Sequence, residues 1–206
     1  MGKIKAVFFD IDGTLVSFKT HRIPPSTLDA VAALRSRGIK VYIATGRPVP
    51  FIDNLGELEY DGMITVTGAH CFTSGGEVIY HQSVSAESVG RVVGHLTHGA
   101  DAYPVIFVCS DEMFITELNE DVDAVARLLD IKMPPVRPAS YACGKDVLQL
   151  ISFFKADREP HFMSALMPDC TSMRWHPFFT DVIAGGVDKS VGIDKVLAYE
   201  GLSLDE

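Results

Sequence analysis

The stretch AVFFDIDGTL, residues 6–15, decides the fold of this chain. Its four consecutive apolar residues, 6–9, predict a buried strand, and Asp10 and Asp12 follow at the point where that strand must end. In an open parallel sheet, ligands bind beyond the carboxyl ends of the strands. Two carboxylates at such a place can hold a divalent cation and act on a phosphate. The stretch therefore predicts an enzyme site at the end of the first strand.

Outward from this stretch, apolar runs alternate with a helical pattern. Residues 41–44 and 63–66 predict two further strands, each followed by a polar turn. Between the first two strands, Ser26 with Asp29 resembles a capping box, and Gly38 is a typical helix stop. Strand, helix, strand, short helix, strand is typical of a doubly wound sheet. The predicted fold class is therefore α/β, with a Rossmann-like parallel-sheet core.

The pattern changes after residue 83. Residues 85–96 and 122–129 have helical spacing, and the strands around them come in pairs. This predicts an inserted α+β domain, with helices on one face of an antiparallel sheet and Trp175 in its core. The predicted boundaries are 1–82 for the first part of the core, 83–184 for the inserted domain and 185–206 for the return segment of the core.

The composition narrows the function classes. With 47% hydrophobic residues the chain can form a core, and its net charge of −9 makes nucleic acid a poor partner. The four cysteines form no C-x-x-C pair, which indicates reduced thiols. The N-terminal apolar run is too short for a signal peptide or a membrane span. We therefore expect a soluble cytoplasmic protein that binds neither nucleic acid nor membrane.

Chemistry at the strand ends follows from the residue types. A carboxylate such as Asp10 can attack phosphorus, while Asp12 can protonate the leaving oxygen and later deprotonate water. Mg²⁺ suits this site, because the carboxylate and the phosphate are both anions and repel each other unless a cation lies between them. Gly13 lets the backbone approach a phosphate, and its N–H can point toward the ligand. Residues 45–47 end the neighbouring strand, and Lys189 can supply a fixed positive charge.

A family resemblance rests on three motifs. Residues 10–15, DIDGTL, residues 44–47, ATGR, and residues 186–189, GVDK, resemble the first three motifs of the haloacid-dehalogenase-like hydrolases. The layout is similar to that of the Cof-type sugar-phosphate phosphatases, in which an α/β cap is inserted between the second and third motifs. The resemblance covers essentially the whole chain. It implies a Mg²⁺-dependent phosphatase that acts on a small phosphorylated metabolite, most readily a sugar phosphate.

The resemblance also implies roles for individual residues. Asp10 would be the nucleophile and a Mg²⁺ ligand, and Asp12 would be the acid/base and a Mg²⁺ ligand through its backbone carbonyl. The phosphate group would be gripped by Thr45 and Lys189. The remaining predicted phosphate-binding residues, which would shape that pocket, are Gly13, Gly46 and Arg47.

Two departures from the family pattern leave alternatives open. Thr67 stands where family members usually have Asn. The fourth motif, a loop rich in Gly and Asp that gives further Mg²⁺ ligands, does not occur before Glu206, so we expect further chain beyond it or an impaired enzyme. The missing fourth motif leaves open a remnant that binds a phosphorylated metabolite without turnover. A phosphomutase, which would retain the aspartyl-phosphate, is the alternative within the enzyme class. The oligomeric state is open, because three parallel strands would leave the first strand at an edge unless later sequence or another chain covers it.

Overall fold

The computed structural model describes residues 3–99 and 101–206. Contacts within the chain divide it into two compact units. The first unit combines Met1–His81 with Val187–Glu206, and the second unit is formed by Gln82–Gly186. The second unit is thus inserted between two parts of the first.

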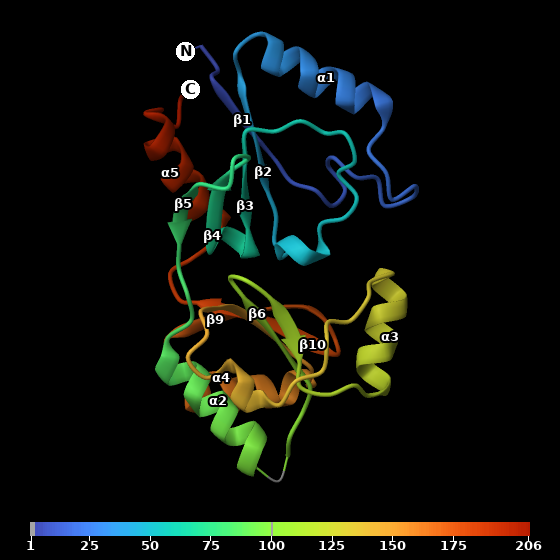
Figure 1. The fold of residues 1–206 in the computed structure, drawn as a ribbon, viewed down its shortest axis with the longest axis vertical. Coiled ribbons are helices and arrows are strands. Elements are labelled where there is room, and N and C mark those ends of the chain that lie inside the picture. Colours follow the sequence, from blue (N-terminus) through green and yellow to red (C-terminus); the bar gives the residue numbers. More distant parts are fainter. Residues whose placement is uncertain (1–2, 100) are drawn as a thin grey trace. The chain divides into compact units, whose positions relative to one another are not determined.

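A five-stranded sheet forms the centre of the first unit (Figure 1). Its strands lie in chain order: β1 (Ala6–Phe9), β2 (Lys40–Ala44), β3 (Gly62–Thr65), β4 (His70–Thr73) and β5 (Val78–His81). The first three strands are parallel, and β4 and β5 continue as an antiparallel hairpin. Three parallel strands confirm the predicted α/β core.

Helices cover both faces of this sheet. On one face, α1 (Pro25–Ser36) contributes Val31 to a cluster with Val41 and Ile43. On the opposite face, α5 (Lys189–Glu200) contributes Val196 to a cluster with Tyr42. Figure 1 shows the two helices on opposite sides of the strands. Alternate residues of β2 thus point into two separate apolar layers, as expected for a strand that is covered on both faces.

Two local expectations for this unit are wrong. The strand β1 is half-buried rather than fully buried, because it lies at the edge of the sheet and β2 is its only partner among the described strands. The helix α1 begins without a side-chain cap: Pro24 occupies the N-cap position, so the predicted capping box at Ser26 does not form. Proline at the start of a helix costs little, since the first N–H groups have no partner in the helix.

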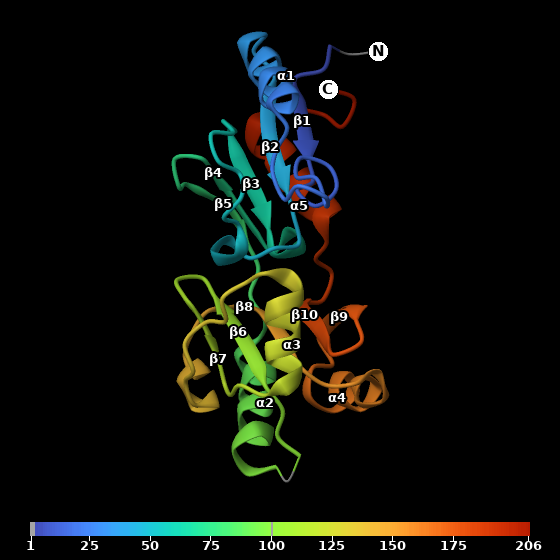
Figure 2. The same ribbon diagram turned by 90° about the vertical axis from the view of Figure 1, so that its right-hand side faces the viewer.

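The second unit has an antiparallel sheet in the order β7-β6-β8-β10-β9 (Figure 2). Its strands are β6 (Val105–Cys109), β7 (Met113–Ile115), β8 (Val147–Ser152), β9 (Cys170–His176) and β10 (Phe179–Ala184), and its helices are α2 (Ala86–His98), α3 (Glu120–Leu129) and α4 (Glu159–Leu166). Short 3-10 helices lie in both units. The first unit has η1 (Val49–Phe51) and η2 (Val66–Gly68), and the second unit has η3 (Ala139–Ala142) and η4 (Ala156–Arg158). The second unit therefore combines an antiparallel sheet with helices, which is an α+β arrangement.

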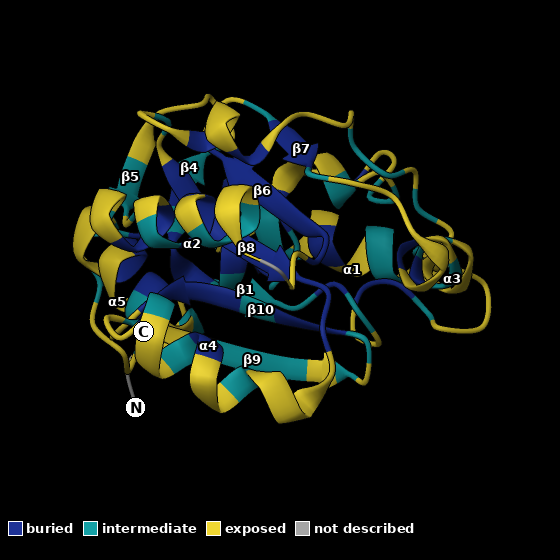
Figure 3. Cartoon of the chain, turned by 90° about the horizontal axis from the view of Figure 1, so that it is seen from below, coloured by how far each residue is buried: buried dark blue, intermediate teal, exposed yellow. Residues whose placement is uncertain are grey.

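Apolar side chains fill the core of the second unit. Val92 of α2 and Phe162 of α4 belong to one cluster with Phe107 and Leu150 of the sheet. Figure 3 shows β8 buried along its length, whereas β9 is only half-buried. Trp175 on β9 is 59% exposed, so its predicted place in the core is wrong. Its indole instead lies at the surface and donates to Asp181.

Two further features concern the described residues. Among the helices of that part of the chain, none has the length and apolar character that crossing a membrane requires.

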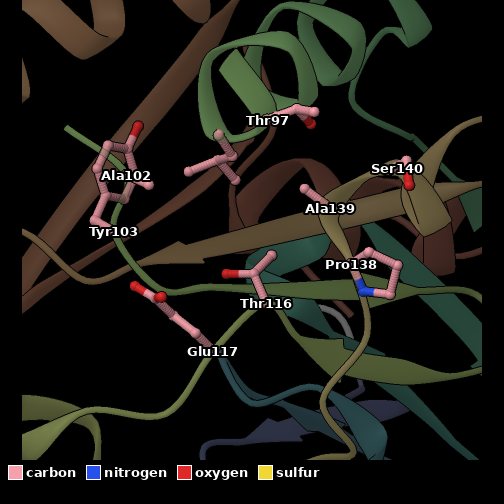
Figure 4. Close-up of a pocket in the computed structure, with 9 residues that line it drawn as sticks. Thr97, Ala102, Tyr103, Thr116, Glu117, Pro138, Ala139 and Ser140 are labelled. Carbon is pink, nitrogen blue, oxygen red and sulfur yellow. The ribbon is translucent and has the colours of Figure 1, made fainter. Parts of the chain in front are cut away.

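A pocket of about 270 Å³ lies in the second unit, lined by residues that include Tyr103, Thr116 and Glu117 (Figure 4). None of the predicted site residues lines this pocket.

Candidate active site

The predicted site residues follow the carboxyl ends of neighbouring parallel strands. Phe9 pairs with Ile43, so Asp10, which follows β1, and Thr45, which follows β2, leave the sheet side by side. Ala44 pairs with Ile64, which brings the end of β3 to the same edge. The carboxyl ends of the three parallel strands therefore bring the residues that follow them to one end of the sheet, where ligands bind in open α/β sheets.

Lys189, which is distant in sequence, lies at the same end of the sheet, beside Asp10. Its Nζ lies 2.6 Å from Oδ1 of Asp10, across 179 residues of sequence. The lysine opens α5, whose N-cap Asp188 accepts the Val191 N–H at 2.9 Å. A hydrogen bond from Ser190 and the one from Val191 hold the pKa of Asp188 below its usual range. The capped helix start therefore fixes the lysine beside the predicted nucleophile.

Arg47 binds Asp12 through two parallel hydrogen bonds. Its Nε lies 2.9 Å from Oδ2 of Asp12, and its Nη2 lies 2.5 Å from Oδ1. Its Nη1 donates to the carbonyl of Phe51 at 3.0 Å. The family resemblance implies that Arg47 shapes a phosphate pocket; in the structure its guanidinium contacts the second carboxylate. Nothing in the sequence spacing indicated the Phe51 contact.

Thr45 and Gly46 form the turn that leads to Arg47. Thr45 is buried, and its Oγ1 accepts the Arg47 N–H at 3.1 Å. The hydroxyl proton of Thr45 is not used in that bond and can be donated to an anion. A Cβ on Gly46 would lie 3.2 Å from Oγ1 of Thr67, so the turn packs closely against the end of β3.

Gly13 supports the first turn in a way that differs from the prediction. Its φ of +77° is a conformation that favours glycine. Its N–H donates to the carbonyl of Val16 at 3.0 Å, so this group closes the turn rather than pointing toward a ligand. A Cβ at this position would lie 2.5 Å from the ring of Phe18. Gly13 is therefore placed as a turn residue.

The end of β3 is strained, which the sequence did not reveal. Val66 and Thr67 have φ values of 50° and 53°, in a region that β-branched residues rarely adopt. Their N–H groups donate to the carbonyls of Arg47 and Thr45, each at 3.2 Å. Next in sequence, Gly68 packs so closely on the carbonyl of Asp188 that a Cβ would lie 2.0 Å from it. The strained segment thus links the Thr45 turn to the start of α5.

The charges at this edge form two ion pairs. Asp10 and Lys189 each expose 38% of their side chains, and Asp12 and Arg47 expose 40% and 29%. The four groups sum to zero charge. Partial exposure leaves the pairs open to solvent screening, so they contribute little to stability. Their value is geometric, because they hold carboxylates and cations together at the strand ends.

The oxygen donors present fit a magnesium ion. Mg²⁺ binds in proteins through one or two carboxylates, with substrate oxygens and water completing the shell. Within the described residues, the backbone carbonyl of Asp12 accepts no hydrogen bond, and Lys189 is the only side chain bonded to the Asp10 carboxylate. The Asp12 carbonyl oxygen and the second carboxylate oxygen of Asp10 are therefore available as metal ligands. In the same part of the chain, no cluster of three or more His, Cys, Asp or Glu side chains is found.

Comparisons with known proteins agree with this geometry. The family of haloacid dehalogenase-like hydrolases matches residues 7–206. The chain belongs to the haloacid dehalogenase-like hydrolases. It is 32% identical to "Putative phosphatase YkrA" of Bacillus subtilis (strain 168), over 94% of this chain and 73% of that protein. It is 25% identical to an Escherichia coli (strain K12 / DH10B) HMP-PP phosphatase, over 95% of this chain and 73% of that one.

Solved structures of this superfamily share the fold. The sugar phosphatase BT4131, described as a member of HAD subclass IIB, is 40% identical, with a TM-score of 0.85 over 98% of this chain and 78% of that chain. The phosphatase BT1666 of Bacteroides thetaiotaomicron is 29% identical, with a TM-score of 0.86 over 98% of this chain and 75% of that chain. The haloacid dehalogenase-like hydrolase described here is thus of the Cof type, and it is a phosphoric monoester hydrolase.

Proposed function

We propose that this chain is a Mg²⁺-dependent phosphatase that hydrolyses small phosphomonoesters through an aspartyl-phosphate on Asp10. One observation supports this most strongly: the Lys189 ammonium lies 2.6 Å from the Asp10 carboxylate, at the edge where the parallel strands end. A nucleophilic carboxylate beside a fixed cation is what phosphoryl transfer requires, because the cation offsets the charge of the incoming phosphate.

In the first half-reaction, an oxygen of Asp10 attacks phosphorus. A bond between Asp10 and phosphorus forms, and the bond between phosphorus and the ester oxygen breaks. The leaving oxygen takes a proton from Asp12, so it departs as a neutral alcohol. Lys189 and the Thr45 hydroxyl bind the phosphoryl oxygens while this happens, since both lie at the same strand ends.

In the second half-reaction, water hydrolyses the aspartyl-phosphate. Asp12, now a carboxylate, takes a proton from the water as its oxygen attacks phosphorus. The bond between phosphorus and Asp10 breaks, and inorganic phosphate leaves. Asp10 is again a carboxylate and Asp12 is again protonated, as each was before the first half-reaction, so ester and water are the only reactants consumed.

The metal we propose is held by the Asp10 carboxylate and the Asp12 backbone carbonyl. When bound there, Mg²⁺ offsets the negative charge that builds up where a carboxylate meets a phosphate. The Asp12 carboxylate is then left to move protons, because the metal uses its carbonyl.

The second unit, Gln82–Gly186, is proposed as a cap that selects the substrate and excludes water during the first step. Its insertion between two parts of the core supports this role. The sugar phosphatase among the related structures supports sugar phosphates as the substrate class. The four cysteines form no disulfide, which supports the cytoplasm, where phosphorylated metabolites are found, as its compartment.

The test is a screen of phosphorylated metabolites with Mg²⁺, in which released phosphate is measured. We expect turnover of sugar phosphates and a loss of at least about 10³-fold in Asp10→Asn, because the nucleophile is removed. The exposed Asp53 in the same unit gives the matched control, and Asp53→Asn is expected to keep full activity. Undiminished turnover by Asp10→Asn would contradict the proposal.

A further inference from the structure

Arg47 contacts Asp12 in a way that its predicted role does not explain. Its guanidinium takes both carboxylate oxygens of Asp12, at 2.9 and 2.5 Å, and is therefore occupied by that carboxylate. A planar guanidinium that makes two parallel bonds fixes the plane as well as the position of a carboxylate. The arginine therefore controls the orientation of Asp12.

The arginine is itself held at three points. Its Nη1 donates to the Phe51 carbonyl at 3.0 Å, at the end of η1. Its own N–H donates to Oγ1 of Thr45 at 3.1 Å, and its carbonyl accepts the Val66 N–H at 3.2 Å. Backbone and side chain are thus both fixed, so the guanidinium presents one geometry to Asp12.

The two carboxylates are treated differently. Asp10 receives a single bond from the Lys189 ammonium, which leaves its second oxygen for reaction or metal binding. Asp12 receives two bonds, one on each oxygen, yet each oxygen keeps a second lone pair that can carry a proton. This difference matches a nucleophile that must move toward phosphorus and a proton carrier that must stay in place.

We propose that Arg47 is a positioning residue, which holds the Asp12 carboxylate in the orientation needed to pass a proton to the leaving oxygen. This inference rests on the proposed function, in which Asp12 moves that proton. It assigns to Arg47 no direct part in binding the phosphate group.

The leaving group separates these two roles. An alkyl phosphate, such as glycerol phosphate, releases a poor leaving oxygen that needs a proton, whereas para-nitrophenyl phosphate releases a stable anion that does not. A positioning role predicts that Arg47→Ala and Arg47→Lys slow the first, ester-cleaving step, measured in a single turnover, by at least about tenfold on the alkyl ester and by less than about threefold on the aryl ester, with little change in KM on either. Lysine fails here because it lacks the planar fork.

Two further measurements sharpen the test. Guanidinium ion added to Arg47→Ala is expected to restore kcat on the alkyl ester, whereas a loss that comes from misfolding is not restored. In the double variant Arg47→Ala with Asp12→Asn, the loss is expected to be no larger than in Asp12→Asn alone, because the arginine acts through that carboxylate. The exposed Arg37 provides the control, and Arg37→Ala is expected to leave both esters unchanged.

The outcomes distinguish the two proposals. If Asp12→Asn discriminates between the esters but Arg47→Ala does not, the positioning role is overturned and the proposed function stands. An equal loss on both esters, with a raised KM, would make Arg47 a phosphate-binding residue and overturn the inference as well. If Asp12→Asn keeps full activity on both esters, the proton role of Asp12 fails, and the inference fails with it.

Discussion

The two units of this chain differ in where their backbone is strained. In the first unit, Val66 and Thr67 adopt left-handed conformations directly beside the site, although β-branched residues resist them. In the described part of the second unit, the only non-glycine residue with positive φ is Asp130, which ends α3. Aspartate tolerates this conformation, and helix ends commonly use it.

From this difference we expect substitutions in the second unit to change mainly stability, and substitutions in the strained segment of the first unit to change mainly catalysis. The second unit has a regular backbone and an apolar core, so packing is expected to dominate its stability. The strained segment of the first unit is held by hydrogen bonds to Thr45 and Arg47, and it packs on the start of α5, which carries Lys189. Strain that persists at such a place points to function, because it fixes the geometry of the site.

The largest effect on stability is expected from Phe107→Ala in the second unit. Phe107 is fully buried and its ring stacks on Phe114 with centroids 5.1 Å apart. The cavity is expected to lower the free energy of unfolding by about 3–5 kcal/mol. Urea unfolding measures it through the fluorescence of Trp175, the single tryptophan of the chain, which lies in this unit.

The comparison of the two units also predicts that Phe107→Ala does not change kcat. The folded variant is expected to keep its kcat at temperatures well below its midpoint. Leu128→Ala, at a residue that is 65% exposed, is the control, and its effect should stay within about 0.5 kcal/mol. A fall in kcat of folded Phe107→Ala would show that stability and chemistry are not separated in this way.

Gly68→Ala in the first unit is expected to have the opposite balance: a smaller loss of stability than Phe107→Ala, and a large loss of activity. An alanine Cβ would lie 2.0 Å from the Asp188 carbonyl, so the start of α5 and Lys189 must shift. We expect about 2–3 kcal/mol in thermal unfolding and at least about a 10²-fold fall in kcat. Gly76 also has positive φ but nothing within 4 Å of its Cβ position. Gly76→Ala should therefore cost only about 1 kcal/mol and leave kcat unchanged.

Asp181 of the second unit links stability to pH. Burial raises the pKa of its carboxyl to about 6, although Trp175 and Gln149 donate to it. Between about pH 4 and pH 6, the folded chain then binds more protons at this group than the unfolded chain, so its contribution to stability falls as pH rises. Asp181→Asn removes this pH-dependent contribution to stability and keeps an acceptor for Trp175.

The variant Asp181→Asn is therefore expected to gain about 1–2 kcal/mol at pH 7 and little at pH 4. Urea unfolding at the two pH values, followed by Trp175 fluorescence, measures the difference. Asp157, an exposed carboxylate of the same unit, gives the matched control, and Asp157→Asn should show no such pH dependence. An equal gain at both pH values would exclude burial of the charge as the cause.

The smallest effect is expected from Thr67→Asn. Asparagine adopts the left-handed conformation more readily than threonine, so relief of strain should stabilise the first unit by about 0.5–1 kcal/mol. Thermal unfolding followed by far-ultraviolet circular dichroism measures the gain. Thr171→Asn, on the extended strand β9, is the control and should bring none. A loss of stability in Thr67→Asn would mean that the Thr67 side chain contributes more than its backbone strain costs.

The sequence predicted the parts of the site that depend on strand ends. Apolar runs located β1 and β2, and the rule that ligands bind beyond parallel strands placed Asp10 beside the Thr45 turn. The family resemblance assigned Lys189 to the same site, and its Nζ lies 2.6 Å from Oδ1 of Asp10. The neighbouring positions of Asp10 and Thr45 were predictable because they depend on a local pattern and on the topology of an α/β sheet.

Other parts of the site were not predictable from the sequence. The direction of the long Arg47 side chain depends on the Phe51 carbonyl, whose position is set by how η1 folds back. The left-handed pair Val66 and Thr67 contradicts the preference of both residue types, so local propensity argues against it. In both cases tertiary contacts decide the outcome, and no spacing in the sequence records them.

The central claim is that Asp10 accepts the phosphoryl group. The most direct test is to mix the chain with Mg²⁺ and a phosphomonoester labelled in its phosphate, to quench with acid, and to map the label by peptide mass spectrometry. The account predicts a phosphoryl group on Asp10 that is released by hydroxylamine, as an acyl phosphate should be, and that is absent in Asp10→Asn. Label on a different residue, or turnover with no labelled protein at any quench time, would contradict it.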